Sequence, residues 1–522
     1  MSVGATMSQN EPHPPSEVRD SREIELKFAL SLKDAETLVT TPPWQSVAPG
    51  KIRKLHSVYF DTADGLLFRS GFSLRIRKEG NRHIQTIKTL GQNDGAFAER
   101  GEWSVPLSGL IPDLEDAAAS VIRPIVGSMT PVAPVEAVFE IAVRRHVCHV
   151  REGQSLVEVA VDFGELRIGE RREAFHELEL ELADGRKADL FALARKIFRE
   201  VPVRLHMQAK AERGFEMLSG ARASLKAGKV GLSGEMPVSQ AFQSVMISCL
   251  RHLMANEAAF WQAGSPETIH QARVAMRRMR AAMQAFRKYT RDEMHDRLRA
   301  ELRDLAGELG AARSIDVYIA DFLTPEAEEQ SDPEYRNLLA EYEKKRERAY
   351  QSAADMLGSP RYRHAILTIA EWITCGNWLE KLPDNIPLLG GYAERALGRS
   401  WKKVRKQARY LETVTEEQRH DLRIAIKKLR YGCEFFSFLF PEGADASEGG
   451  VKRKHELRKR IVRHLVSLQD ALGMLNDIAE ARNRNPLSDM AQKLFAQREA
   501  MCPQLMEQVG QEYAALEKRF PF

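Results

Sequence analysis

The sequence predicts a multidomain α+β protein, in which a strand-rich N-terminal domain precedes an all-helical C-terminal domain. Segments of alternating apolar and polar residues fill much of the chain between about residues 23 and 182. This period of two places successive side chains on opposite faces of a sheet. From about residue 239 the apolar residues instead recur with the 3.6-residue period of amphipathic helices. Two different patterns therefore divide the chain.

Composition sets broad limits on the class of protein. The chain has 522 residues, of which 43% are apolar, and this suits a globular protein of several domains. The net charge of +4 says little about partners, because 77 basic residues nearly balance 73 acidic ones. The cysteines are scattered without a CxxC pair, which argues against a disulfide framework. They are Cys148, Cys249, Cys375, Cys433 and Cys502.

Neither a membrane span nor a signal peptide is predicted. No segment reaches the roughly 18 consecutive apolar residues that a span requires. The N-terminus is polar, contains several prolines, and lacks an apolar core. We therefore expect a cytoplasmic protein without a membrane partner.

Composition also marks the domain boundaries. Residues 1–20 are polar and contain Pro and Ser, which predicts a disordered tail. Residues 21–218 hold the alternating segments and a helix over about 188–200. Residues 219–238 are rich in Gly, Ser, Ala and Lys, which is typical of a linker. Residues 239–522 form the helical domain.

The strand segments carry charged residues at alternate positions. In a half-exposed sheet such charges would form a solvated outer face, and the run Glu23-x-Glu25-x-Lys27 alone fits that interpretation. Other segments repeat the pattern: Arg75 with Arg77, Arg100 with Glu102, Glu140 with Arg144, Glu158 with Asp162, and the row Glu177, Glu179 and Glu181. A sheet closed into a barrel could point such rows into a polar lumen.

A lumen with both signs of charge suits a metal–triphosphate complex. Arginines and lysines neutralise phosphates, and arginine contacts them through two nitrogens at once. Glutamates repel phosphate, but they hold hard divalent cations, which in turn hold phosphate oxygens. A bound metal can also lower the pKa of a water and aim it at the terminal phosphorus.

The same residues resemble the CYTH superfamily, the triphosphate tunnel metalloenzymes. Glu23-x-Glu25-x-Lys27 is similar to the ExExK signature of that family, and further segments match it in order over about residues 21–218. They are Tyr59-Phe60-Asp61-Thr62, Leu74-Arg75-Ile76-Arg77, Thr86-Ile87-Lys88, Arg100-Gly101-Glu102-Trp103, Phe139-Glu140 with Arg144, Asp162-Phe163-Gly164, Glu177-x-Glu179-x-Glu181 and Lys210-Ala211-x-Arg213-Gly214.

The resemblance implies an eight-stranded antiparallel β tunnel with flanking helices. It also implies Mg²⁺ or Mn²⁺ as cofactor, held by Glu23, Glu25, Glu177 and Glu179, with the register among Glu177, Glu179 and Glu181 left open by one step. The implied phosphate-binding residues are Lys27, Arg75, Arg77, Lys88, Arg100, Arg144 and Lys210. Glu102 and Asp162 would lie in the polar lumen and complete the catalytic set. Tyr59 and Phe60 are interpreted as packing residues.

An internal repeat marks the helical half. One copy contains His270, Arg273, Arg277 and Arg280, and the other contains His420, Arg423, Lys427 and Arg430, at the same offsets from the histidine. At about 100° per residue these offsets fall on one stripe about 80° wide. A merely solvated face would include carboxylates that form i,i+4 pairs, but residues 270–288 contain none. The stripes therefore predict contact with a polyanion. Metal binding, capping and packing remain alternative roles for the histidines.

The repeat resembles the CHAD domain over about residues 239–518. Besides the two histidine helices, the pairs Leu309-Gly310 and Leu472-Gly473 carry the likeness, while Ser314 stands where the family commonly has Asp. The resemblance implies two pseudo-symmetric four-helix bundles and a basic groove that binds inorganic polyphosphate.

Together these features predict an inorganic triphosphatase, which cleaves tripolyphosphate to pyrophosphate and phosphate, with polyphosphate bound by the helical domain. Association with polyphosphate granules would follow. A class IV-type adenylyl cyclase and a non-catalytic polyphosphate-binding protein are the alternatives. A nucleic-acid binder ranks last, because an aromatic content of 7% provides no stacking platform.

Overall fold

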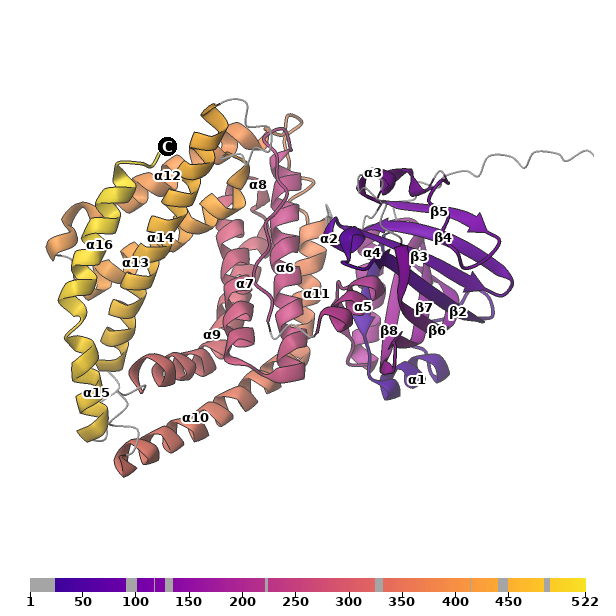
Figure 1. Cartoon of the computed structure of the whole chain (residues 1–522), viewed down its shortest axis with the longest axis horizontal. Coiled ribbons are helices and arrows are strands. Elements are labelled where there is room, and N and C mark those ends of the chain that lie inside the picture. The colour runs from indigo at the N-terminus through magenta and orange to yellow at the C-terminus, as the bar shows by residue number, and fades with distance from the viewer. Residues whose placement is uncertain are drawn as a thin grey trace, which may run out of the picture.

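A sheet domain and a helical domain lie side by side in the computed structural model (Figure 1). The structure describes residues 24–90, 101–116, 118–126, 135–220, 224–323, 332–413, 415–439, 449–482 and 489–522. The predicted disordered tail, residues 1–20, lies outside these ranges. Within them, no helix is both long enough and apolar enough to cross a membrane.

The N-terminal domain is built on an antiparallel sheet, as the sequence predicted. Its strands are β1 (Glu25–Ala29), β2 (Lys51–Thr62), β3 (Phe72–Glu79), β4 (Arg82–Thr89), β5 (Glu102–Leu107), β6 (Val135–Glu152), β7 (Ser155–Ile168), β8 (Arg171–Asp184) and β9 (Arg204–His206). Their order is β5-β4-β3-β2-β6-β7-β8-β1-β9. The predicted count of eight is one too low, because the short β9 pairs with β1. Within the described residues the sheet is open, with β5 and β9 at its edges.

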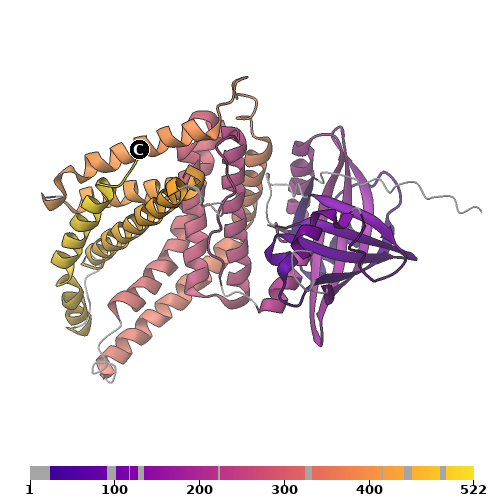
Figure 2. The ribbon, with the colours of Figure 1, turned by 45° about the horizontal axis from the view of Figure 1, so that its top comes forward.

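The sheet curls strongly, which both views of the ribbon make visible (Figures 1 and 2). Glu102 on β5 and Glu25 on β1 line one cavity, although six strands separate β5 from β1 in the sheet order. The alternation of the strands sorts side chains between the two faces. On β8, Glu179 faces the cavity, while Leu178 and Leu180 face the opposite way and are fully buried. On β8 the outward face therefore joins the apolar core, while the inward face carries polar side chains. Elsewhere the inward face also holds a smaller apolar cluster that includes Tyr59 and Phe139.

Helices cover the outward face of the sheet. Leu178 and Leu180 share a core with Ala35 and Leu38 of α1 (Leu32–Thr40) and with Phe191 of α4 (Lys187–Glu200). The short helices α2 (Leu66–Arg69) and α3 (Arg123–Val126) cover a second apolar cluster. Helix α5 (Lys210–Ser219) begins at the cavity, so its first residue contacts the lumen.

The C-terminal domain is all-helical, as predicted. Its helices are α6 (Val238–Ala263), α7 (Pro266–Ala285), α8 (Arg287–Thr290), α9 (Glu293–Val317), α10 (Pro333–Gly358), α11 (Pro360–Cys375), α12 (Leu389–Gln407), α13 (Glu416–Phe435), α14 (Gly449–Arg482), α15 (Asp489–Glu499) and α16 (Cys502–Glu517). Helices α6, α7, α9 and α11 pack into one bundle, while α12, α13, α14 and α16 form the other. The duplicated helices α7 and α13 contact each other between the bundles.

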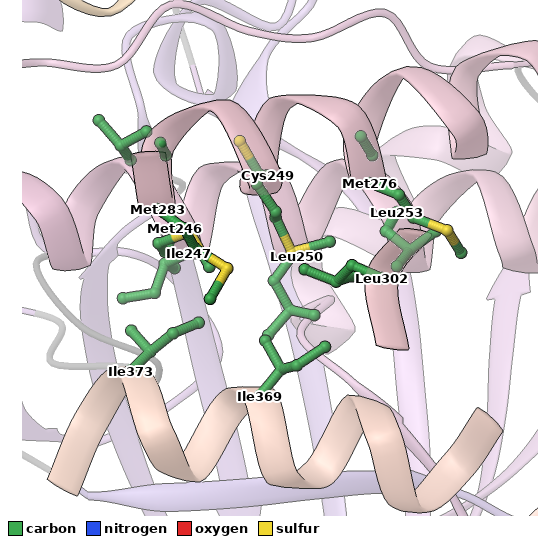
Figure 3. Packing of buried hydrophobic residues seen from close by; sticks show 14 of the residues in the cluster. Met246, Ile247, Cys249, Leu250, Leu253, Met276, Met283, Leu302, Ile369 and Ile373 are labelled. Atoms are coloured by element: carbon green, nitrogen blue, oxygen red, sulfur yellow. The ribbon is translucent and has the colours of Figure 1, made fainter. Parts of the chain in front are cut away.

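The first bundle has a dense apolar core (Figure 3). Leu250 of α6, Leu302 of α9 and Ile369 of α11 point toward one another, and each is at most 1% exposed. Burying a side chain of this size contributes about 1.5–3 kcal/mol relative to leaving it exposed. This core fixes α7 and thereby the direction of its basic stripe.

Matching caps set the register of the two duplicated helices. The Ser265 side chain accepts a hydrogen bond from the Thr268 N–H at the start of α7. The Thr415 side chain does the same for Gln418 at the start of α13, where Gln418 completes a capping box. Each cap lies five positions before its histidine, His270 or His420. The two stripes therefore begin at the same height on their helices.

The two domains are in direct contact. Helix α11 packs on α4 and β9, and α6 also contacts β9. Arg195 on α4 pairs with Glu371 on α11, and the guanidinium of Arg204 on β9 lies 5.6 Å from the ring centre of Trp261. The predicted linker, residues 219–238, lies between α5 and α6, and its Leu225 is hydrogen-bonded to Asn256 of α6.

Candidate active site and basic groove

A cavity of about 140 Å³ lies within the curled sheet. Its wall brings together eight residues that the sequence predicted for the tunnel: Glu25, Lys27, Arg75, Arg77, Lys88, Glu102, Glu179 and Lys210. They come from β1, β3, β4, β5, β8 and α5. Two further predicted residues, Glu23 and Arg100, lie outside the described residues. The cavity combines carboxylates and cations in one small space.

A cluster of three carboxylates lies on β7 and β8. One oxygen from each of Asp162, Glu177 and Glu179 lies within 4.8 Å of the other two. The side chains are 0%, 1% and 10% exposed, respectively. Burial raises the pKa of Glu177, but nearby cations, led by Lys210, more than offset this and lower it to about 2. Burial also raises the pKa of Glu179, which Arg145 and Lys210 nonetheless hold well below its usual range.

Both glutamates are therefore ionised at neutral pH. Ionised carboxylate oxygens are the ligands that hard cations such as Mg²⁺ and Mn²⁺ prefer. The cluster fits a divalent cation in donor type and spacing. Glu25 lies on the same cavity wall, 2.9 Å from Lys27 Nζ. Glu181 also lines the cavity, so Glu179 and Glu181 share the lumen face of β8.

Arg145 is a cavity residue that the sequence reasoning missed. Its Nε and Nη2 donate to the two oxygens of Asp162 at 2.7 Å each, and Nη2 also donates to Glu179. Burial lowers the pKa of Arg145, but the two carboxylates raise it well above its ordinary value. Arg145 therefore joins β6 to the acidic cluster as a permanent cation.

The prediction that Arg144 lines the tunnel is wrong. The Arg144 side chain is exposed on the outer face of the sheet, with its guanidinium carbon 4.5 Å from the Phe163 ring centre. Glu140 shares that face and contacts His56 at 2.9 Å. Because neighbouring residues on a strand point to opposite faces, only one of the two adjacent arginines can enter the lumen. That residue is Arg145, which pairs with Asp162 across the β6–β7 ladder.

Another wall of the cavity, formed by β3 and β4, is basic. Arg75 and Arg77 project into the cavity from β3, and Lys88 of β4 pairs with Glu102 of β5. Burial, followed by the charge of Arg75, lowers the pKa of Arg77 to about 10. Burial and repulsion both disfavour the charged form, so an anion in the cavity would stabilise this wall.

Tyr59 both packs and lines the cavity. Its ring stacks on Phe139 with centroids 4.6 Å apart, which agrees with the packing role that the sequence suggested. Burial raises the pKa of the hydroxyl, yet Arg75 and Arg77 outweigh this and lower it. Tyr59 thus faces the arginines from β2.

Two other residues outside the predicted set support Glu177. His206 Nε2 and Arg213 Nη2 lie 3.6 and 3.3 Å from Glu177 Oε1. Burial is the main cause that lowers the pKa of His206 to about 4, so the imidazole is neutral at pH 7. The helical spacing from Lys210 to Arg213 could have indicated that both face the same site.

A second cavity, of about 600 Å³, lies between the helical bundles. We call it the basic groove, and it contains seven of the eight residues predicted to bind a polyanion: His270, Arg273, Arg277, Arg280, His420, Arg423 and Lys427. Arg299 and Arg313 of α9 also line the groove. They were missed, although their spacing places them on one face of a helix.

The eighth residue, Arg430, does not line the groove. Its Nε donates to Gln469 at 2.8 Å, and its Nη1 pairs with Glu434 one turn further along α13. Its predicted place in the groove is therefore wrong, because local partners hold the guanidinium.

The groove holds its cations at an electrostatic cost. Burial lowers the pKa of Lys427 to about 7, with help from Arg423 and Arg277. Burial also lowers the pKa of His270 to about 4, with help from Arg313. The Nε atoms of Arg277, Arg280, Arg299 and Arg423 are buried without a hydrogen-bond partner among the described residues. Buried donors without partners are costly, and anionic oxygens would satisfy them.

Comparisons with known proteins agree with this two-part architecture. Residues 21–215 match the CYTH domain family, and residues 244–485 match the CHAD domain family. The inorganic triphosphatase of Haemophilus influenzae is 28% identical over 195 residues, which cover 37% of this chain and 54% of that protein. The chain therefore spans about half the length of this curated relative.

Solved structures resemble each half. The CHAD domain of the plant Ricinus communis is 26% identical, with a TM-score of 0.43, over 58% of this chain and 93% of that one. A candidate adenylyl cyclase from Hippeastrum with a dominant triphosphatase activity is 18% identical, with a TM-score of 0.29, over 37% of this chain and 96% of that one. The two resemblances predicted from the sequence are confirmed by the family matches: the chain contains a CYTH domain followed by a CHAD domain.

Proposed function

We propose that the CYTH domain is a metal-dependent inorganic triphosphatase, which hydrolyses tripolyphosphate to pyrophosphate and phosphate. The observation that carries this proposal is the meeting of two walls in one cavity. Glu179 of β8, which belongs to the acidic cluster with Asp162 and Glu177, lines one wall, and Arg75 and Arg77 of β3 line another. A metal on the first wall and phosphates on the second would neutralise both.

Mg²⁺ or Mn²⁺, held by Glu177, Glu179 and Asp162 with Glu25 nearby, would supply Lewis-acid polarisation of the phosphate oxygens. The residues of the chain supply the remaining functions. Arg75 and Arg77 neutralise and orient the triphosphate through fixed, paired N–H donors. Lys27 and Lys88 add charge on the adjacent strands, and the curled sheet restricts the access of water.

The size of the cavity favours an inorganic substrate over a nucleotide. Pockets that enclose drug-sized ligands measure about 300–1,000 Å³, whereas this one is about 140 Å³. A bound nucleoside would have to remain largely outside. The relative from Haemophilus influenzae, named an inorganic triphosphatase, also supports this choice over a cyclase.

We further propose that the CHAD domain binds inorganic polyphosphate in the basic groove. The groove is about 600 Å³ and carries arginines from α7, α9 and α13. Its buried donors without partners support a ligand made of repeated anionic oxygens. Binding in the groove would hold polyphosphate chains near the CYTH domain, and the chains would not have to enter the smaller cavity.

Phosphate release tests the proposed activity. The purified protein is incubated with tripolyphosphate, ATP or thiamine triphosphate, in Mg²⁺, Mn²⁺ or EDTA, and cyclic AMP is measured beside phosphate. We expect metal-dependent release from tripolyphosphate that is lost in Glu179→Gln. The matched control is Glu165→Gln, since Glu165 lies on the same sheet but pairs with Arg167 on the exposed face. Cyclic AMP formed from ATP without tripolyphosphate cleavage would establish the cyclase instead.

A further inference from the structure

The ammonium of Lys210 lies at the centre of the carboxylate cluster. Lys210 Nζ is 2.9 Å from Asp162 Oδ2, 2.8 Å from Glu177 Oε2 and 2.7 Å from Glu179 Oε1. The Lys210 side chain is 11% exposed. A single positive charge therefore bridges three carboxylates whose oxygens all lie within 4.8 Å of one another.

The ammonium fits this position imperfectly. Of the three contacts, only the one with Glu179 has hydrogen-bond geometry. Glu177 Oε2 is buried and has no hydrogen-bond partner among the described residues, although the ammonium lies 2.8 Å away. Three oxygens that converge on a point without matching the directions of N–H donors suit a spherical ion better.

The same space cannot hold the ammonium and a divalent cation together. Mg²⁺ binds carboxylate oxygens at about 2.0–2.1 Å, so an ion among these oxygens would overlap the present position of Lys210 Nζ. The two positive charges would also repel each other strongly in a buried site. One of them must leave when the other is bound.

The carboxylates keep other partners if the ammonium leaves. Arg145 remains bound to Asp162 and Glu179, and Arg213 remains 3.3 Å from Glu177. Lys210 itself is the first residue of α5 and also lines the cavity, between Ala209 and Ala211. Its long side chain can therefore turn toward the basic wall while the cluster stays intact.

We propose that Lys210 is an internal counter-ion that occupies the metal site in the metal-free protein and is displaced by the divalent cation. The freed ammonium then joins the cations that contact the triphosphate. Metal and triphosphate consequently strengthen each other's binding. This inference rests on the proposed metal-triphosphate function, and it adds the residue that couples the two ligands.

Manganese binding, measured by the loss of the free Mn²⁺ electron paramagnetic resonance signal, tests the proposal without any turnover. Removing the competitor in Lys210→Met should tighten Mn²⁺ binding by about tenfold or more, a normal size for coupling between ligands. The matched control is Lys88→Met, which removes a cavity cation that pairs with Glu102 instead of the cluster. Its Mn²⁺ affinity should change much less.

The coupling is measured with an uncleaved triphosphate analogue. In the wild type the analogue should tighten Mn²⁺ binding, and in Lys210→Met this enhancement should shrink. Equal effects of Lys88→Met and Lys210→Met on Mn²⁺ affinity would overturn the proposal, because they would indicate a general effect of charge. No effect of Lys210→Met would also overturn it, because Lys210 and Mn²⁺ would then not compete. A circular dichroism melt checks that each variant is folded.

A measurement on the wild type covers the case in which Lys210→Met does not fold. The protein is treated with a small amine-reactive reagent, and the modification of the Lys210 peptide is measured by mass spectrometry. The extent of this modification should increase when Mn²⁺ is added, and an unchanged extent would contradict displacement. The two proposals also fail separately. If tripolyphosphate is cleaved but Lys210→Met does not change Mn²⁺ binding, only the counter-ion proposal is refuted. If Lys210→Met tightens Mn²⁺ binding but no tripolyphosphate is cleaved, only the triphosphatase proposal is refuted.

Discussion

Arg145 on β6 and Asp162 on β7 are opposite each other in the sheet and form a two-point ion pair, with both N–O distances at 2.7 Å. The Asp162 side chain is fully buried, and that of Arg145 is 15% exposed. Such a pair fixes the guanidinium plane, and the third contact, to Glu179, ties it to β8. The acidic cluster therefore depends on this arginine for charge balance as well as position.

Replacing Arg145 with Met should destabilise the metal-free protein strongly. The substitution leaves Asp162 and Glu179 with Lys210 as their remaining shared cation, and breaking a buried pair in this way costs about 3–5 kcal/mol. Urea or thermal unfolding in EDTA measures the effect. Arg144→Met is the control, since Arg144 is exposed and its guanidinium lies over the face of Phe163, a cation–π contact of about 0.5–1 kcal/mol. Equal losses in the two variants would refute the assignment of Arg145 to the lumen.

Arg423 and Arg430 occupy corresponding faces of α13 but should differ in their effect on polyphosphate binding. Arg423 lines the groove with a buried Nε that has no partner among the described residues, whereas Arg430 is held by Gln469 and Glu434. A charged hydrogen bond contributes about 1.5–3 kcal/mol, so Arg423→Gln should weaken binding by roughly tenfold or more. Arg430→Gln should leave it nearly unchanged.

Isothermal titration with a polyphosphate of defined length, at several salt concentrations, measures both variants. Loss of a phosphate contact should also make the binding less sensitive to salt. A larger loss in Arg430→Gln than in Arg423→Gln would place the ligand outside the groove.

The sequence predicted most of the residues that line the cavity, but it did not distinguish between adjacent residues of the same type. The alternation on β3 and β8 was enough to place Arg75, Arg77 and Glu179 on one face, because strand parity follows directly from spacing. It was not enough on β6, where basic residues stand at both 144 and 145. A shift of one residue in strand register moves every side chain to the other face of the sheet. Only the pairing of Arg145 with Asp162, on the next strand, shows which of the two arginines faces the lumen.

Tertiary partners explain the other differences. Arg430 has the same offset from its histidine as Arg280, yet its guanidinium is bound by Glu434 and Gln469 and does not itself line the groove. Strand β9 contains only residues 204–206, which is too short for any periodic signal. Its pairing with β1 depends on where α4 ends, and the sequence pattern alone does not give that.

Lys427 should make polyphosphate binding dependent on pH. Burial and the charges of Arg423, Arg277 and Arg430 lower its pKa to about 7, against the opposing charge of Asp477. A bound polyanion stabilises the ammonium and raises this pKa, so binding takes up a proton when the pH is above about 7. Affinity should therefore fall between pH 7 and pH 9.

Titrations in buffers of different ionisation enthalpy report this proton uptake directly. Lys427→Arg keeps the charge across the whole range, since arginine stays protonated, and should flatten the dependence. The same slope in the wild type and in Lys427→Arg would assign the proton to another group.

Glu257 should make the contact region between the domains less stable as the pH rises. This buried carboxyl of α6 accepts a hydrogen bond from Tyr362 of α11 at 3.0 Å, near Arg204 of β9. Burial raises its pKa to about 7, despite the lowering effects of Tyr362 and Arg204. Because the folded pKa is above the unfolded value of about 4.3, the folded state binds more protons. The stabilisation is complete below about pH 4 and is lost as the pH rises through about 7.

Glu257→Gln removes this titration while it keeps the size of the side chain and an acceptor for Tyr362. The difference in melting temperature between Glu257→Gln and the wild type should therefore grow in favour of the variant from pH 5 to pH 8. Glu380→Gln, an exposed position in the same domain, serves as the control and should show a constant difference. A pH-independent difference for Glu257→Gln would mean that the carboxyl is already ionised in the folded protein at pH 5, as it is in the unfolded chain, and would contradict the raised pKa.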